Sequence, residues 1–164
     1  MRRRVLIALA LLIGAVVCNQ AGAQQVAQPL VGYLSGVSVS ARSNTIEAFK
    51  TGLGSEGFVE GRNVRIEYLS ADGRPDRLPG LAVELARRKP AVIAATGGPL
   101  AGLAAKRATA TIPIVFTSGI ADPVKVGLVA GLNRPGGNLT GVYFLIGELV
   151  AKRLALMKEV ILNR

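Results

Sequence analysis

Pro90-Ala91-Val92-Ile93-Ala94-Ala95-Thr96-Gly97-Gly98 is the stretch of this chain that decides its fold class. Its apolar run, residues 91–95, has no polar interruption, which is typical of a parallel-sheet strand covered by helices on both faces. The run ends in a Thr-Gly-Gly turn, and Pro99 follows where a helix would have its first turn. Ligands of open α/β sheets bind at the carboxyl ends of strands, so a binding site is expected at this turn.

Strand and helix patterns alternate on both sides of this stretch. Strands are predicted at 30–34, 63–71, 91–96, 112–116 and 138–144, and helices at 41–56, 76–89, 99–109, 122–132 and 147–162. The strand at 63–71 alternates apolar and polar residues, so it is expected near a sheet edge. Asp76 and Asp122 are expected to cap the helices that they begin. The rhythm predicts an α/β fold, a three-layer, Rossmann-like, doubly wound parallel sheet.

Two of the predicted helices have apolar faces that should be buried. The helix at 99–109 is expected to bury Leu100, Leu103, Ala104 and Ala108, and the helix at 122–132 is expected to bury Val126, Val129 and Leu132. The last helix, 147–162, carries an apolar seam of Val150, Leu154, Met157 and Ile161. Such a seam needs a cover, so self-association through this helix is expected.

The first 23 residues have the pattern of an export signal. Three arginines, Arg2 to Arg4, precede an apolar run at 5–17 and a small-residue cleavage site at 21–23. The run rises about 20 Å as a helix, less than the hydrocarbon core of about 30 Å, which disfavours a transmembrane span. We therefore predict a cleavable signal peptide at 1–23 and a periplasmic protein that starts at Gln24. A lipid anchor at Cys18 is disfavoured because Val17 stands where a small residue is expected.

Cys18 is the only cysteine, and the chain has no histidine. In a mature protein from Gln24, this argues against disulfides, thiol or histidine catalysis and ordinary zinc sites. The glycines after the 91–96 strand do not follow G-x-G-x-x-G, and no phosphate-loop motif is present, so no cofactor is expected. Removing three signal arginines from 20 basic residues leaves 17 against 10 acidic ones, a charge of +7. These charges are dispersed and rarely neighbour aromatic residues, so no nucleic-acid partner is expected.

Three of the predicted strands end in small hydroxyl or glycine residues. Their turns contain Ser35, Thr96, Gly97, Gly98, Thr117 and Ser118. Hydroxyls and free backbone N–H groups at helix starts can hold a carboxylate or a similar anion, so these residues are candidate ligand contacts. Asp122, whose simpler role is a helix cap, completes the candidate set. The competing explanation is that tight turns favour such residues anyway, and the residues alone leave both open. No catalytic or metal-binding residue is predicted.

From residue 31 to about residue 160, the sequence resembles substrate-binding proteins of ABC transporters of the tryptophan/tyrosine type. The matching stretches are 31–35, 57–64, 76–79, 92–98, 112–116, 122–124, 132–142 and 152–154, and the most specific is Asn-Arg-Pro-Gly-Gly-Asn at 133–138. The resemblance implies a type 1 periplasmic-binding fold, in which two Rossmann-like lobes close over a small solute without catalysis. It also implies a permease in the inner membrane as partner and an amino acid or similar small organic solute as ligand.

The resemblance divides the chain into a signal peptide, a ligand-binding lobe at 24–146 and a helix at 147–164. In the family that helix leads into a second lobe, which is absent here, so the chain is expected to be a truncated member or a fragment. A site between two lobes would then receive at most half of its contacts from this chain.

Two other functions compete with this interpretation. A small secreted Rossmann-like hydrolase or transferase would need a serine or threonine nucleophile beside a lysine, because histidine is missing. A sugar-responsive repressor core would need a DNA-binding helix-turn-helix, which the sequence lacks, and the export signal argues against it. We expect a binding protein rather than an enzyme.

Overall fold

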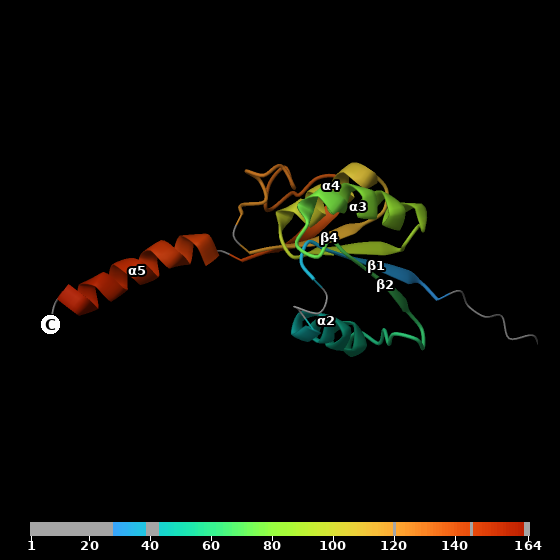
Figure 1. Cartoon of the computed structure of the whole chain (residues 1–164), viewed down its shortest axis with the longest axis horizontal. Helices are drawn as coiled ribbons and strands as arrows, with labels where there is room; N and C mark the ends of the chain where they lie inside the picture. Colours follow the sequence, from blue (N-terminus) through green and yellow to red (C-terminus); the bar gives the residue numbers. More distant parts are fainter. Residues whose placement is uncertain (1–27, 39–42, 120, 145, 163–164) are drawn as a thin grey trace, which may run out of the picture.

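The computed structural model describes residues 28–38, 43–119, 121–144 and 146–162. The predicted signal peptide, Cys18 and the predicted mature start at Gln24 lie outside the described residues. The described chain forms one parallel sheet of five strands in the order β2-β1-β3-β4-β5 (Figure 1). These strands are β1 (Leu30–Ser35), β2 (Arg65–Ser70), β3 (Val92–Thr96), β4 (Ile114–Ser118) and β5 (Leu139–Tyr143). The predicted α/β class is confirmed, and β2 lies at an edge as expected.

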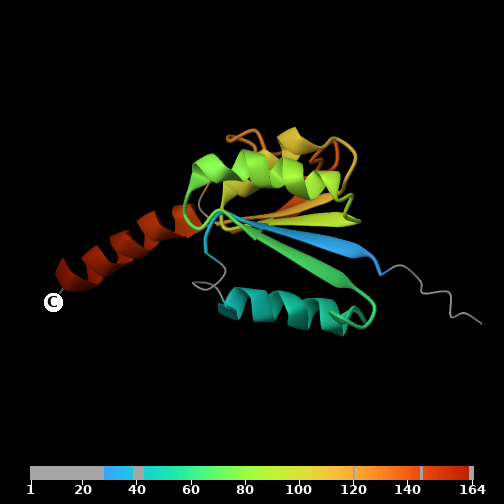
Figure 2. The ribbon, with the colours of Figure 1, turned by 45° about the vertical axis from the view of Figure 1, so that its right-hand side comes forward.

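Helices lie on both faces of the sheet and make it the middle of three layers. The helix α2 (Ser43–Ser55) lies on one face, and α3 (Leu78–Arg87) and α4 (Pro99–Ala108) lie on the other (Figures 1 and 2). Successive side chains of a strand point to opposite faces, so each strand contributes to two separate cores. Val31 and Tyr33 of β1 accordingly belong to the core under α2, whereas Leu34 belongs to the core under α3 and α4.

The larger core lies between the sheet and the α3/α4 layer. Its fully buried side chains include Leu34, Leu85, Ile93 and Ile114, all with 0% exposure. Gly32 lets α3 approach closely, because a Cβ atom at Gly32 would lie 2.7 Å from a methyl carbon of Leu85. Close packing of this kind favours glycine where a helix crosses a strand.

The smaller core lies under α2. The ring of Tyr33 packs at centroid distances of 5.2 Å from Phe49 and 5.5 Å from Tyr68. Burial raises the pKa of Tyr68, and the nearby Glu60 carboxylate raises it further. The remaining members of this core come from α2, β1, β2 and β3 or their flanks: Val31, Ile46, Leu53, Val64, Ile66, Val92 and Ala94. No residue of β4 or β5 belongs to this core, so α2 covers only part of its face.

The prediction of a helix at 122–132 is wrong, because this segment forms turns. Asp122 still behaves as a cap: its Oδ1 accepts the N–H of Val124 at 2.8 Å. Gly127 has a φ of +74°, outside the helical region, which stops a helix from continuing. Val129 is buried as expected, but Leu132 is 61% exposed.

The prediction that Asp76 caps the next helix is also wrong. Asp76 lies in a 3-10 turn, Pro75–Arg77, and pairs with Arg74 at 3.2 Å, while α3 begins at Leu78 without a side-chain cap. The guanidinium of Arg74 donates a hydrogen bond to Asp76 and lowers the pKa of its carboxyl.

Leu100 of α4 is 51% exposed rather than buried. The residues that α4 buries are small instead: Ala101, Gly102, Ala104 and Ala105. Gly102 makes room for Leu128, whose methyl carbon would lie 2.7 Å from a Cβ atom there. Small residues let the helix lie close to the sheet, and this contact outweighs the larger apolar surface of Leu100.

The last helix, α5 (Ile146–Leu162), leaves the end of β5 and extends away from the sheet (Figures 1 and 2). Every residue from Leu149 to Leu162 is exposed. Within the described ranges, no helix combines the length and the apolar character needed to span a membrane.

Candidate functional site

The carboxyl ends of four neighbouring strands bring hydroxyl side chains into one line. Ser35 at the end of β1 is paired with Ser70 of β2 on one side and with Thr96 of β3 on the other. Thr117 of β4 follows the residue pair Ala95 and Phe116, which places it next in the same line. We call Ser70, Ser35, Thr96 and Thr117 the hydroxyl row.

The whole row belongs to the sheet face that carries α2. Tyr33, Tyr68 and Ala94 each stand two residues before a member of the row, and all three belong to the core under α2 or pack against it. Because side chains alternate along a strand, the members two residues later point to the same face. The sheet therefore presents a band of hydroxyl groups at its carboxyl edge, beyond the end of its apolar core.

Ser70 is a member of the row that the sequence analysis missed. Its Oγ lies 2.9 Å from the carbonyl oxygen of Val37 and 2.8 Å from Oδ1 of Asp72, and it accepts the N–H of Asp72 at 3.0 Å. The two-residue spacing of Ile66, Tyr68 and Ser70 was the signal that could have placed it on this face.

Ser35 lies at the centre of the row and is only 3% exposed. Its Oγ donates to the carbonyl oxygen of Val37 at 2.7 Å and accepts the N–H of Val37 at 3.2 Å. The backbone ties the neighbouring strand ends together as well. The N–H of Gly36 donates to the carbonyl of Thr96 at 3.1 Å, and the N–H of Ala71 donates to the carbonyl of Ser35 at 2.9 Å.

Thr96 differs from the other members of the row in its hydrogen bonding. Its Oγ1 is buried and has no hydrogen-bond partner among the described residues. A buried hydroxyl without a partner costs about 1–3 kcal/mol, so native structures rarely keep one without a reason. Such a group at the carboxyl end of a central strand is the strongest indication of a ligand contact in the described structure.

Gly97 and Gly98 form the turn from β3 into α4, with φ angles of +77° and +124°. A side chain at Gly97 would be strained, and its Cβ atom would lie 3.0 Å from the backbone nitrogen of Gly36. Pro99 occupies the first turn of α4, and no side chain caps the helix. The backbone therefore comes close to the row here, and the amino end of α4 is open to an anionic group.

Ser118 and Asp122 have structural partners instead. Ser118 is fully buried, and its Oγ donates to the carbonyl oxygen of Ala121 at 2.7 Å. It follows Phe116 at the two-residue spacing, so it points to the α4 face, away from the hydroxyl row. The structure thus brings Ser35, Thr96, Thr117 and the Gly97-Gly98 turn together and adds Ser70. Ser118 ends β4 on the opposite face of the sheet, and Asp122 lies in the loop after β4. Whether any of these residues contacts a ligand remains a prediction.

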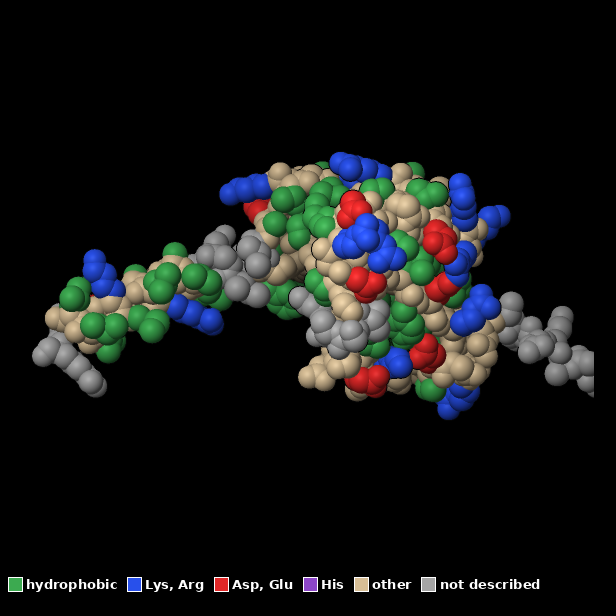
Figure 3. Space-filling view, viewed as in Figure 1, with side chains coloured by type: hydrophobic (Ala, Val, Ile, Leu, Met, Phe, Trp, Pro, Cys, Tyr) green, Lys and Arg blue, Asp and Glu red, His purple; other side chains and the backbone are tan. Residues whose placement is uncertain are grey.

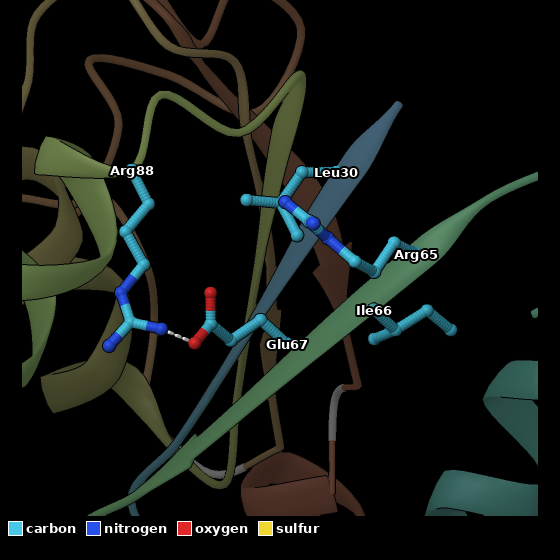
Figure 4. Close-up of a pocket in the computed structure, with 5 residues that line it drawn as sticks. All are labelled: Leu30, Arg65, Ile66, Glu67 and Arg88. Atoms are coloured by element: carbon cyan, nitrogen blue, oxygen red, sulfur yellow. Dashed lines mark ion pairs between the residues drawn. The ribbon is translucent and has the colours of Figure 1, made fainter. Parts of the chain in front are cut away.

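A hollow lies at the opposite, amino end of the strands (Figure 4). Arg88 forms ion pairs with Glu67 and Glu84, so two of the three charges that line the hollow neutralise each other. Figure 4 shows Ile66 pointing away from the pair, toward the other face of β2. Arg65 is the remaining charged residue of the hollow. It lies far along the strands from the hydroxyl row, so the two features are separate.

Across the described residues, no group of three or more histidine, cysteine, aspartate or glutamate side chains could hold a metal ion. A G-x-G-x-x-G match that the sequence analysis overlooked occurs at 52–57, at the end of α2. A dinucleotide fingerprint must lie between a strand and the start of a helix, so this match does not predict a nucleotide site.

Comparison with known proteins shows which sequences this chain is similar to. A family model described as ABC transporter substrate binding protein matches residues 31–163. A tyrosine-binding protein from Clostridioides difficile (strain R20291) is 35% identical over 95 residues, which cover 58% of this chain and 27% of that protein. The chain therefore aligns with much less than two thirds of this relative.

Solved structures share the fold. A conserved domain protein from Vibrio cholerae O1 biovar El Tor superposes with a TM-score of 0.73 at 32% identity, over 83% of this chain and 45% of that one. A substrate-binding protein with adhesive properties from Clostridium difficile, in its ligand-free, open structure, gives 0.65 at 31% identity. An ABC domain from Streptococcus pneumoniae in complex with L-Trp gives 0.64 at 25% identity. Each of the last two comparisons covers 71% of this chain and 39% of the solved one. Since the family model matches well over half of the chain, this protein belongs to the ABC transporter substrate-binding protein family.

Proposed function

We propose that this chain binds a small organic solute at the hydroxyl row and the Gly97-Gly98 turn, as part of the solute-binding component of an ABC uptake transporter. The observation that carries the proposal is the buried Oγ1 of Thr96, which has no partner among the described residues. A ligand oxygen or nitrogen atom would satisfy this hydroxyl and recover the cost of leaving it unpaired. Its position at the carboxyl end of a central strand is where α/β sheets bind ligands.

The chemistry of the site favours a ligand with a carboxylate. The amino end of α4 has no side-chain cap, and the helix dipole attracts negative charge there. The names of two relatives agree with this chemistry, because one is a tyrosine-binding protein and the other was solved with L-Trp. We therefore propose an amino acid as ligand, with aromatic amino acids as the first to test.

We also propose that residues 24–146 form one ligand-binding lobe. The alignments cover 39 to 45% of the lengths of the solved relatives, which corresponds to about one lobe of a two-lobed binding protein. A ligand held between two lobes receives contacts from both, so this lobe by itself supplies one wall of the site and should bind weakly.

Binding without catalysis is part of the proposal. Two lysines of the body have carboxylate or carbonyl oxygens as partners. Lys50 pairs with Glu60 at 3.2 Å, and Lys106 donates to the carbonyls of Gly127 and Leu128 at 2.7 and 3.0 Å. Both ammonium groups are therefore engaged by oxygens other than the hydroxyl of a candidate nucleophile.

Export to the periplasm follows from the amino-terminal sequence, and the chain would then meet the permease of its transporter there. Mass spectrometry of the protein recovered from a periplasmic extract should give an amino terminus at Gln24. Recovery of the protein with residues 1–23 intact from that extract would contradict a cleavable signal.

Nuclear magnetic resonance titration tests the site directly. Uniformly ¹⁵N-labelled protein from Gln24 would be titrated with L-tyrosine and, separately, with L-tryptophan. We expect amide shifts concentrated at residues 35–38, 70–73 and 96–98, with saturation only in the millimolar range because one wall of the site is present. Thr96→Val should weaken these shifts at least several-fold.

Thr111→Val is the matched control, because Thr111 is exposed at the other end of the sheet, before β4. It should leave the titration unchanged. Shifts confined to Arg65 and Arg88, or shifts that Thr96→Val does not alter, would contradict the proposed site.

A further inference from the structure

The sheet has an uncovered strip beside α2. Val115 of β4 is paired with Ala94 on one side and with Thr140 of β5 on the other, so it points to the face that carries α2. Yet Val115 is 40% exposed, and Val142 and Phe144 farther along are each 51% exposed. We call Val115, Thr140, Val142 and Phe144 the open strip. A sheet in a three-layer fold normally has both faces covered, whereas no helix of the described residues covers this strip.

The helix α5 has the complementary property. Its apolar side chains are exposed by 44 to 69%: Leu149, Val150, Leu154, Leu156, Met157, Val160, Ile161 and Leu162. All but Leu162 fall within an arc of roughly 160° around the helix axis. Figure 3 shows hydrophobic side chains on the visible face of this helix. Arg153 is the one charged residue of 149–162 inside the arc, and its long stem can lie on an apolar surface while its guanidinium reaches solvent.

We propose that two copies of this chain dock reciprocally, each laying its α5 on the open strip of the other. The direction of α5 supports this arrangement. The helix leaves the carboxyl edge of the sheet and points outward (Figures 1 and 2). A partner's α5 that arrives from the same edge runs antiparallel to the strands. This is the direction that a helix takes between two parallel strands, and α2 beside the strip runs the same way.

The area supports a reciprocal contact rather than a single one. A helix of 17 residues is about 25 Å long and 10 Å wide, so it covers roughly 250 Å² on each of the two surfaces that meet. Two such contacts remove on the order of 1,000 Å² from solvent, which is the lower limit for a specific interface. One contact would remove half of that, which is typical of non-specific association. A two-fold symmetric pair is also the commonest form of protein dimer.

Pairing of two α5 helices explains less of the surface. Val150, Leu154, Met157 and Ile161 are spaced as the core positions of only two heptads, and helices this short are marginal on their own. Such a pair would leave Leu149, Leu156 and Val160 in water, and it would leave the open strip bare.

Sedimentation velocity on the chain from Gln24 to Arg164 measures the association. We expect a species of twice the monomer mass at high micromolar concentration. Leu154→Asp on α5 and Val142→Lys on the strip should each restore the monomer. Both positions are exposed, so circular dichroism should show that the two variants keep the fold. Val83→Lys, at a residue of α3 that is 42% exposed, is the matched control and should stay dimeric.

Cross-linking identifies which surfaces meet. The chain from Gln24 has no cysteine, so single cysteines can be introduced without side reactions. A short bismaleimide should link Val142→Cys to Leu154→Cys in a mixture of the two variants, and it should link Leu154→Cys to itself only weakly. A strong Leu154→Cys homodimer would show that the helices pair with each other. That result, a monomeric wild-type chain or a dimer that survives Val142→Lys would each overturn the proposal.

Discussion

Replacing Thr96 with valine should make the protein more stable and less able to bind. The Oγ1 of Thr96 is buried at the end of β3 without a partner among the described residues, which costs about 1–3 kcal/mol. Valine has nearly the same shape and keeps the β-branch that suits a strand, but it has no polar group to leave unsatisfied. We expect the free energy of unfolding to rise by about 1 kcal/mol, the lower end of this range, because the residue as a whole is half-buried.

Urea denaturation followed by circular dichroism measures this change. The midpoint should move to higher urea at an unchanged slope, and the melting temperature should rise by about 3 °C. Thr96→Ser is the control, because it keeps the hydroxyl and loses a methyl group. It should lower the free energy of unfolding by about 0.8 kcal/mol.

A valine variant that is less stable than the wild type by more than about 1 kcal/mol would refute the reasoning. Such a loss would mean that the hydroxyl already has a partner within the protein and acts in folding. If the variant is more stable and also loses the amide shifts caused by L-tyrosine, Thr96 is kept for binding at the expense of stability.

Two further predictions use matched pairs of variants and the same unfolding assay. Gly32→Ala should lower the free energy of unfolding by about 1–3 kcal/mol, because its Cβ atom would lie 2.7 Å from the side chain of Leu85. Gly52→Ala, on the open side of α2 with no atom within 4 Å, should instead raise it by about 0.5–1 kcal/mol; equal effects at the two sites would count against this packing. Asn138→Ala should cost about 1–2 kcal/mol, because the Nδ2 of Asn138 donates to the carbonyls of Thr109 and Ile112 at 3.2 and 2.6 Å. Asn133→Ala, at an exposed position, should change stability by less than about 0.5 kcal/mol, and a loss as large as that of Asn138→Ala would argue against this bridge.

The order of strands and helices could be predicted from the sequence because the period of the apolar residues changes clearly between elements. The uninterrupted run in β3 and the alternation in β2 indicated a central and an edge strand, and the sheet has them in those places. The segment 122–132 misled the prediction because Asp122-Pro123 is a strong helix start. What decided its structure was Gly127 with its positive φ, which the capping signal does not reveal.

The face of α4 could not be predicted because size and hydrophobicity point in opposite directions there. Leu100 is the more apolar residue, but only Gly102 and its alanine neighbours allow the helix to pack tightly against the sheet. The candidate site was predictable in part. The strand ends at Ser35 and Thr96 are visible in the sequence, whereas the missing partner of Thr96 depends on the surroundings of one atom.

The bonds between neighbouring strand ends have a thermodynamic consequence for recognition. Gly36 is held to Thr96, Ala71 to Ser35 and Gly73 to Gly36 by backbone hydrogen bonds of 2.9 to 3.1 Å. These loops are therefore already ordered in the free protein, and a ligand does not have to supply the conformational entropy of fixing them. Weak binding by this lobe would then reflect a small number of contacts and not a cost of folding the site. A partner surface that closed over the ligand would raise affinity through added contacts alone, without first ordering this rim.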